Sequence, residues 1–187
     1  MGNMRTDDSV GFKIRRLTDH ERIFDFSSGD PDMDDFIVNR AHLYSEQRLS
    51  ANYVLYHSMY EDLPVAFFSL SCDRVCMSDF ATSTEFNRFR RKRFVNSKRL
   101  KGFPAIKIGR IAVMSDFQGQ GLSSVIVDTI KSFVFEVRYV GCRFLTVDSY
   151  RNRVDMYRKY GFELLCSSTS DTESTTCHMY YDLISLK

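Results

Sequence analysis

The spacing of apolar and polar residues changes along the chain, and the changes mark its elements. Apolar residues recur at helical spacing between positions 122 and 137 and predict a helix there (Leu122, Val125, Ile126, Ile130, Phe133, Val134 and Val137). A β-branched and apolar run at 106–113 predicts a strand just before it. A short turn with two glycines separates the two, so this stretch reads as strand, turn and helix.

The same criteria place the remaining elements. Runs rich in β-forming residues predict strands at 12–17, 53–59, 65–72, 142–148, 162–166 and 179–184, with 60–64 as a hairpin loop. A helix should begin at Pro31, capped by Asp30, and end near Gln47, burying Met33, Phe36, Ile37 and Leu43. A shorter helix at 153–160 should stop at Gly161. This mixture predicts an α/β (α+β) fold.

Length and composition predict one domain over residues 1–187. A chain of 187 residues that is 43% hydrophobic can bury a sizeable core, and no long linker divides it. Residues 1–11 read as an irregular terminus. No apolar run reaches the roughly 20 residues that span a bilayer, and the N-terminus lacks the apolar core of a signal peptide. We therefore expect a soluble, cytoplasmic protein.

The five cysteines are odd in number and the four histidines are scattered. This pattern predicts a reducing compartment and no metal site.

Positive charge is concentrated in an insertion at 73–103. Residues 88–101 hold eight of the 26 basic residues and no acid. One interpretation is a solvated helix whose aromatics, Phe86, Phe89 and Phe94, pack against a sheet. The other is a surface for phosphates, on which Arg90, Arg91 and Arg93 contact the substrate, because clustered arginines supply forked donors.

The turn between the central strand and helix carries candidate chemistry. Gly119 and Gly121 lack a Cβ, so backbone N–H groups can approach a ligand, and the helix adds its own unpaired donors. This predicts a pyrophosphate cradle, although glycine is also routine in turns that bind nothing. Neither a P-loop nor a Rossmann turn fits the spacing.

Gln118, Gly121 and Ser123 form a string Q-x-x-G-x-(small) that resembles the coenzyme A pyrophosphate motif of the GNAT family of N-acetyltransferases. Ser123 departs from the usual glycine or alanine. Some forty residues later, Met156 to Phe162 resembles the family segment (F/L)-Y-x-x-x-G-F. The resemblance implies a single mixed, mostly antiparallel sheet of six to seven strands flanked by helices, with a splayed parallel pair at the cofactor cleft.

The resemblance also implies acetyl-CoA as co-substrate, without a metal. The residues that it assigns to the cofactor are Ile111, Ala112, Val113, Gln118, Gly119, Gln120, Gly121, Leu122, Ser123, Ser124 and Asn152. Many relatives carry asparagine seven residues before the tyrosine, where this chain has Tyr150. Asn152 is therefore a candidate that lies two positions late.

The implied chemistry is direct attack of an amine on the thioester. A bulge near 111–113 would free backbone donors for the oxyanion. Tyr157 would give a proton to the coenzyme A thiolate, because a phenol with a pKa of about 10 can protonate it. The alternative for Tyr157 is a core aromatic without a catalytic role.

The acceptor amine is suggested by the absence of a general base. Residues 108–113 hold no carboxylate, and Asp116 and Asp148 could act through water or simply line loops. An α-amine has a pKa of about 8, against about 10.4 for a lysine amine, and therefore needs less help to lose its proton.

A closer resemblance points to one substrate. Residues 26–36 and 108–113 resemble the F-x-x-G-x-P and (L/I)-G-R-L-A-V segments of the tRNA-acetylating toxin branch. That branch implies the α-amine of aminoacyl-tRNA as acceptor and a basic surface that holds the RNA. An antitoxin and a second copy of the chain are the candidate partners. The alternatives are a small amine, peptide or protein N-terminus as acceptor, and a coenzyme A-binding or RNA-binding module without activity.

Overall fold

The computed structural model describes residues 12–57, 60–94, 100–136, 140–165 and 175–186. The irregular terminus expected at 1–11 lies outside this part of the chain, as do Lys98 and Arg99 of the basic run.

The chain forms two compact units. Unit 1 comprises Met1–Ser71 and Ile108–Phe133, and unit 2 comprises Cys72–Lys107 and Val134–Lys187. Unit 1 has the strand order β1-β2-β3-β4 and unit 2 the order β3-β4-β5-β7-β6, so that β3 (Tyr60–Cys76) and β4 (Gly102–Val113) contribute to both. The pairing is antiparallel except between β4 and β5, which confirms the predicted mixed α/β sheet. The prediction of a single domain stays a prediction.

In unit 1, β1 (Phe12–Arg16) pairs with β2 (Ala51–His57), and β2 pairs with β3. The loop predicted at 60–64 is wrong, because these residues belong to β3 and Tyr60 pairs with His57. The sequence favours a loop at 60–64 because the segment contains two acidic residues and a proline. The register shift between Leu55 and Tyr56 explains the difference, since Pro64 pairs there and a bulge tolerates a residue without an N–H.

The helix predicted from Pro31 to near Gln47 is confirmed, with an irregularity inside it. It consists of α1 (Pro31–Asp35), a π-helical turn (Phe36–Arg40) and α2 (Ala41–Glu46). The Asp30 side chain accepts hydrogen bonds from the backbone N–H groups of Asp32 and Met33, as predicted for a cap. Leu43 was expected in the core but is 43% exposed. The π turn adds a residue, which rotates the following face so that other residues of α2 are buried.

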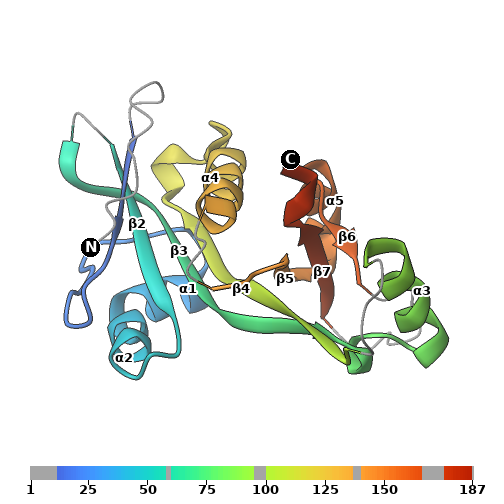
Figure 1. Cartoon of the computed structure of the whole chain (residues 1–187). Helices are drawn as coiled ribbons and strands as arrows, with labels where there is room; N and C mark the ends of the chain where they lie inside the picture. Colours follow the sequence, from blue (N-terminus) through green and yellow to red (C-terminus); the bar gives the residue numbers. More distant parts are fainter. Residues whose placement is uncertain (1–11, 58–59, 95–99, 137–139, 166–174, 187) are drawn as a thin grey trace. The chain divides into compact units, whose positions relative to one another are not determined.

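Helices cover both faces of the sheet in unit 1 (Figure 1). On one face, α1 and α2 bury a core that includes Phe36, Ile37 and Phe67. On the other face lies α4 (Leu122–Glu136), where the Phe133 ring meets Tyr53 edge-on at 5.9 Å. The predicted central strand and helix are thus confirmed.

Unit 2 is built around β5 (Phe144–Tyr150) and β7 (Thr176–Asp182), which pair antiparallel, with β6 (Glu163–Leu164) outside β7. Helix α3 (Ser83–Arg93) packs Phe86 and Phe89 against Phe103, Phe144 and Tyr180. The aromatics of the basic segment are therefore tucked against the sheet, which confirms the structural interpretation for these rings.

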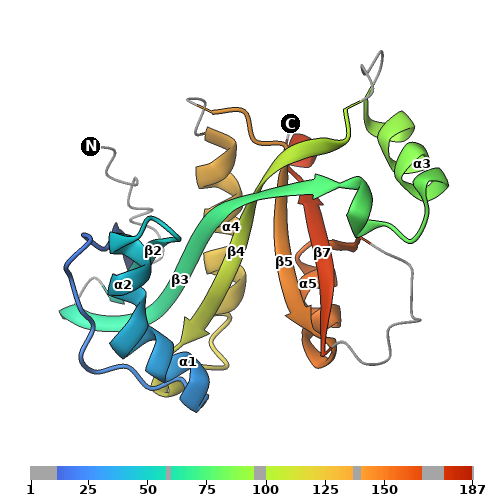
Figure 2. The same ribbon diagram turned by 90° about the horizontal axis from the view of Figure 1, so that it is seen from below.

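Helix α5 (Val154–Lys159) belongs to the opposite face of unit 2. Its Tyr157 ring meets Phe162, which in turn contacts Tyr181, each pair with centroids 5.6 Å apart. Because Tyr180 faces α3 and successive strand residues point to opposite faces, α3 and α5 lie on different sides of β7 (Figure 2). Gly161 ends α5 at φ +81°, as predicted.

Candidate active site

The turn between β4 and α4 has the backbone that its glycines predict. Gly119 and Gly121 adopt φ values of +76° and +78°, a region that disfavours residues with a Cβ. No atom lies within 4 Å of a Cβ built at either position. The glycines are thus required by conformation, and the space beside them is open.

The backbone donors of this turn are available to a ligand. Ser124 donates to the Gly121 carbonyl at 3.0 Å, but the N–H groups of residues 119–123 donate to none of the residues that the structure describes. They lie beside the N-terminal end of α4, where unpaired donors and the helix dipole favour an anion. Leu122 is buried and anchors the turn. This arrangement fits a pyrophosphate, so the residues present suit the group that the motif implies.

The side chain of Gln118 is hydrogen-bonded within unit 1, unlike the backbone N–H groups of the turn. Its side-chain amide donates to the Ser28 carbonyl at 2.8 Å and to the Val113 carbonyl at 2.9 Å. The Ser115 N–H donates to the Ser27 carbonyl at 2.9 Å. The side chain of Gln118 therefore ties the turn to the rest of unit 1, and its assignment to the cofactor stays a prediction.

Two of the carbonyl groups that accept these hydrogen bonds belong to the segment at 26–36, which resembles the toxin branch. Asp34 accepts hydrogen bonds from the Ser28 backbone at 2.7 Å and the Ser28 hydroxyl at 2.6 Å, and Gly29 turns the chain at φ +81°. The turn before α1 is thus fixed to the helix and presents its carbonyls to residues 115–118. The positive φ of Gly29 explains why a glycine occurs there.

The end of β4 supplies the remaining predicted cofactor residues of unit 1. Ala112 and Val113 are buried, and Ile111 is half-buried. The Met114 N–H donates to the Val65 carbonyl at 2.9 Å. The bulge expected at 111–113 stays a prediction.

Tyr157 lies in unit 2, on α5, and is 8% exposed. Burial raises the pKa of its phenol to about 12, with a smaller contribution from Tyr160 and an opposing one from Arg153. None of the described residues hydrogen bonds to its hydroxyl. The side chain is therefore protonated at any physiological pH and has a proton to give.

Asn152 lies in the 3₁₀ turn Arg151–Arg153 that joins β5 to α5, and its side chain is exposed. It belongs to unit 2 like Tyr157, whereas the turn at 118–124 and residues 111–113 belong to unit 1.

Unit 2 contains a polar cluster that the sequence did not predict. Asp148 on β5 accepts hydrogen bonds from Lys107 on β4 and from the His178 ring on β7, the latter at 2.6 Å. The His178 bond first, and Lys107 after it, lower the pKa of Asp148 to about 2. Asp148 is thus ionised and a weak base by itself. Asp116, the other candidate base, is exposed in the 3₁₀ turn Ser115–Phe117.

Asp148 should make the fold sensitive to acid. Its folded pKa is depressed, so its contribution to stability is present above the unfolded pKa and is lost as the pH falls from about 4 towards 2. Because the side chain is 41% exposed, solvent screening reduces that contribution to about 1 kcal/mol. Urea unfolding should show Asp148→Asn less stable than wild type at pH 7. The difference should vanish near pH 2, and an equal difference at both pH values would contradict the assignment.

Helix α3 divides its basic residues between two faces. Arg93 donates to the Tyr180 hydroxyl, lies 3.5 Å from Asp182 and 3.7 Å from Glu163, and stacks on Phe89 at 4.2 Å. It is a structural residue that holds α3 to β7. Arg90 is partly buried and donates to Asn87 at 3.0 Å.

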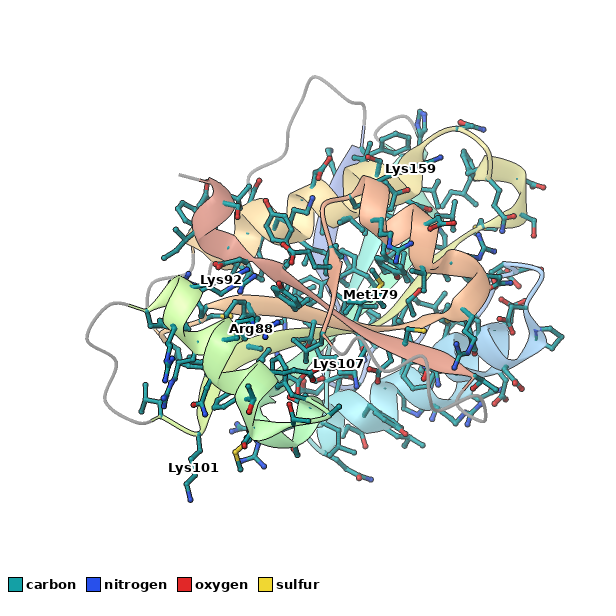
Figure 3. The ribbon with its side chains drawn as sticks, turned by 90° about the vertical axis from the view of Figure 1, so that its right-hand side faces the viewer. Arg88, Lys92, Lys101, Lys107, Lys159 and Met179 are labelled. Carbon is teal, nitrogen blue, oxygen red and sulfur yellow. The ribbon has the colours of Figure 1, made fainter. Side chains whose placement is uncertain are left out.

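The outer face of α3 is formed by Arg88, Arg91 and Lys92, which are exposed. With Thr84 and Asn87 they line a hollow of about 500 Å³. Lys101, before β4, extends away from the ribbon (Figure 3). Of the three arginines proposed as substrate contacts, Arg91 therefore points outward, while Arg90 and Arg93 are turned towards the unit.

Arg93→Met should destabilise the protein by about 1 kcal/mol, because it removes the ion pairs of Arg93 with Asp182 and Glu163, although Asp182 keeps its hydrogen bonds to Arg143. Arg91→Met, on the exposed face of the same helix, removes the same charge and is the matched control. Chemical unfolding should lower the midpoint for Arg93→Met alone. Equal midpoints for the two variants would show that the Arg93 contacts contribute nothing.

Among the described residues, no three metal-ligating side chains come together, and no helix is long and apolar enough to cross a membrane.

Unit 1 has the strand, glycine turn and helix, and unit 2 has the tyrosine, that the resemblance to the acetyltransferases implies. Residues 91–183 match the family model described as the acetyltransferase (GNAT) domain, and this part of the chain is a GNAT acetyltransferase domain. No curated protein matches the chain.

Solved structures show the same fold at low sequence identity. AtaT complexed with acetyl-methionyl-tRNAfMet has a TM-score of 0.73 at 17% identity, covering 94% of this chain and 96% of that one. A tyrosine-to-phenylalanine mutant of KacT scores 0.72 at 17% identity, covering 94% and 97%. The corresponding kind of mutant of the toxin AtaT, bound to the C-terminus of the antitoxin AtaR and acetyl-CoA, scores 0.69 at 17% identity, covering 94% and 96%.

Proposed function

We propose that the protein transfers the acetyl group of acetyl-CoA to a primary amine, and that this amine is the α-amine of an aminoacyl-tRNA. The observation that carries the proposal is the basic face on α3, formed by Arg88, Arg91 and Lys92, in a chain that carries a GNAT acetyltransferase domain. Its hollow suits the phosphates of an RNA backbone. The likeness to AtaT, solved with acetyl-methionyl-tRNAfMet, supports the same acceptor.

In this proposal the turn at 119–123 binds the cofactor's pyrophosphate through its unpaired N–H groups. Acetyl-CoA supplies the thioester when bound. Tyr157 holds the proton that the departing thiolate takes, and burial, which raises the pKa of its phenol to about 12, keeps that proton in place at physiological pH.

Arg93 and the aromatic cluster fix α3 to the sheet of unit 2, so the basic face is presented on a rigid helix. Such a face binds RNA without sequence discrimination, because phosphate contacts carry no base information. Selection of the aminoacyl group therefore requires other residues.

The same neighbours support a protein partner. AtaT is solved with its antitoxin AtaR, so an antitoxin of similar kind is the partner that we propose for this chain.

The function is tested by incubating total aminoacyl-tRNA with the protein and acetyl-CoA, followed by mass spectrometry of the released aminoacyl groups. We expect an acetyl group on one or a few amino acids, and none when acetyl-CoA is left out. Acetylation of free amino acids or peptides but of no aminoacyl-tRNA would assign a small amine as the acceptor instead. Absence of transfer to any amine would rule out the activity.

A further inference from the structure

A network of polar side chains joins α3, β7 and β6 within unit 2. Arg93 on α3 donates to the Tyr180 hydroxyl on β7, and that hydroxyl donates to the Glu163 carboxylate on β6 at 2.5 Å. Tyr180 is buried, so its hydroxyl has its acceptor and its donor role filled by these two residues. Arg93 also lies 3.7 Å from Glu163, which closes the network. The function proposed so far gives Glu163 no part.

The strand that carries Glu163 is held weakly by its own backbone. Strand β6 lies at the edge of the sheet, pairs with β7 and has two residues. Beyond it, the Leu165 N–H donates to the His178 carbonyl at 3.0 Å. Two residues are fewer than most strands contain, so this ladder gives little stability by itself. The side-chain bond from Tyr180 to Glu163 therefore adds an attachment that β6 needs.

The residue next to Glu163 in the chain holds Tyr157. The Phe162 N–H donates to the Tyr157 carbonyl at 3.0 Å, and the two rings meet edge-on with centroids 5.6 Å apart. Phe162 is buried against α5, whereas Glu163 points to the α3 side, as expected for successive residues of an extended segment. One short segment thus contacts the tyrosine on one face and the polar network on the other.

The position of the Tyr157 phenol depends on these contacts. None of the described residues hydrogen bonds to its hydroxyl, so the ring is placed by its packing against Phe162 and Tyr160 and by the backbone of α5. A general acid must meet the departing atom within hydrogen-bond reach, and a displacement of about 1 Å is costly. Whatever fixes Phe162 therefore also fixes the acid.

From these contacts we infer that Glu163 is a positioning residue for Tyr157. Its bond to Tyr180 anchors β6, β6 anchors Phe162, and Phe162 holds the Tyr157 ring where its proton can pass to the coenzyme A thiolate. Glu163 neither gives nor takes a proton in the reaction. The inference rests on the proposed function, in which Tyr157 is the acid.

The test is a double-mutant cycle with Tyr157→Phe, read as kcat for acetyl transfer to total aminoacyl-tRNA at saturating acetyl-CoA. Glu163→Ala should lower kcat about tenfold and leave the KM for acetyl-CoA unchanged. In the Tyr157→Phe background the same substitution should lower kcat by less than about twofold, because the group through which it acts is absent. A residue that only stabilises the fold would have the same effect in both backgrounds.

Three further variants complete the test. Glu163→Gln keeps an acceptor oxygen for the Tyr180 hydroxyl and should restore most of the kcat. Tyr180→Phe breaks the same bond from the other side, and should reproduce the loss even if Glu163→Ala lowers the melting temperature. Glu136→Ala is the matched control, since it removes an exposed carboxylate from α4 in the same unit and should leave kcat unchanged.

The outcomes separate the inference from the function on which it rests. An unchanged kcat in Glu163→Ala, or an equal loss with and without the Tyr157 hydroxyl, would overturn the inference while acetyl transfer by wild type stands. If wild type transfers acetyl to no amine, the proposed function fails, and the inference fails with it.

Discussion

Replacing Tyr157 by phenylalanine should lower kcat by about 100-fold, the contribution expected of a general acid, while the affinity for coenzyme A stays the same. The substitution removes one oxygen to which none of the described residues hydrogen bonds, so the ring contacts with Tyr160 and Phe162 persist. Thiol release at saturating acetyl-CoA gives kcat, and calorimetry with coenzyme A gives the affinity.

The control for this variant is Tyr160→Phe, the neighbouring half-buried tyrosine of the same segment. It should change kcat little. Because burial raises the pKa of Tyr157 to about 12, loss of its proton should not limit activity until the pH approaches that value. An unchanged kcat in Tyr157→Phe would make Tyr157 a core aromatic and remove the acid from the mechanism.

Local patterns in the sequence were sufficient for the cofactor side of the site. Two glycines, an apolar strand and an apolar helix stripe specify a turn with positive φ at Gly119 and Gly121, and the structure has that turn. The hydrogen bond of Gln118 could not be predicted from local patterns, because its partner Ser28 lies ninety positions away along the chain. No local pattern reports such a contact.

The division of the basic residues of α3 between two faces follows from helical spacing in the sequence, although the sequence analysis did not predict it. Phe86, Phe89, Arg90 and Arg93 follow helical spacing and share one face. Once the phenylalanines are assigned to the core, Arg90 and Arg93 must lie at its edge. The wrong prediction for Leu43 has another origin, since periodicity assumes a regular helix and cannot anticipate the π turn at 36–40.

The pair of Asp148 and His178 could not be predicted from the sequence. The two residues are thirty positions apart, and their register depends on how β7 returns beside β5. A lone histidine at alternate spacing in a strand carries no signal of a partner. The contact between this carboxylate and the histidine therefore becomes visible only in the structure.

Replacing Arg88, Arg91 and Lys92 together by glutamine should raise the KM for aminoacyl-tRNA by at least about tenfold at low salt. The slope of log KM against log salt should fall by about 2, since three phosphate contacts are lost at about 0.7 each. The KM for acetyl-CoA should not change. Arg93 is left in place because it holds α3 to β7, and its removal should destabilise unit 2.

A triple variant with Arg16, Arg22 and Lys159 changed to glutamine removes the same charge from exposed positions elsewhere and is the control. It should leave the salt slope close to that of wild type. A soluble aminoacyl ester without RNA separates the two candidate acceptors further, because the α3 variant should acetylate it as well as wild type does. If the α3 variant keeps its full salt dependence with aminoacyl-tRNA, the basic face does not bind the RNA. The acceptor would then be recognised without the phosphate backbone, as expected for a small amine.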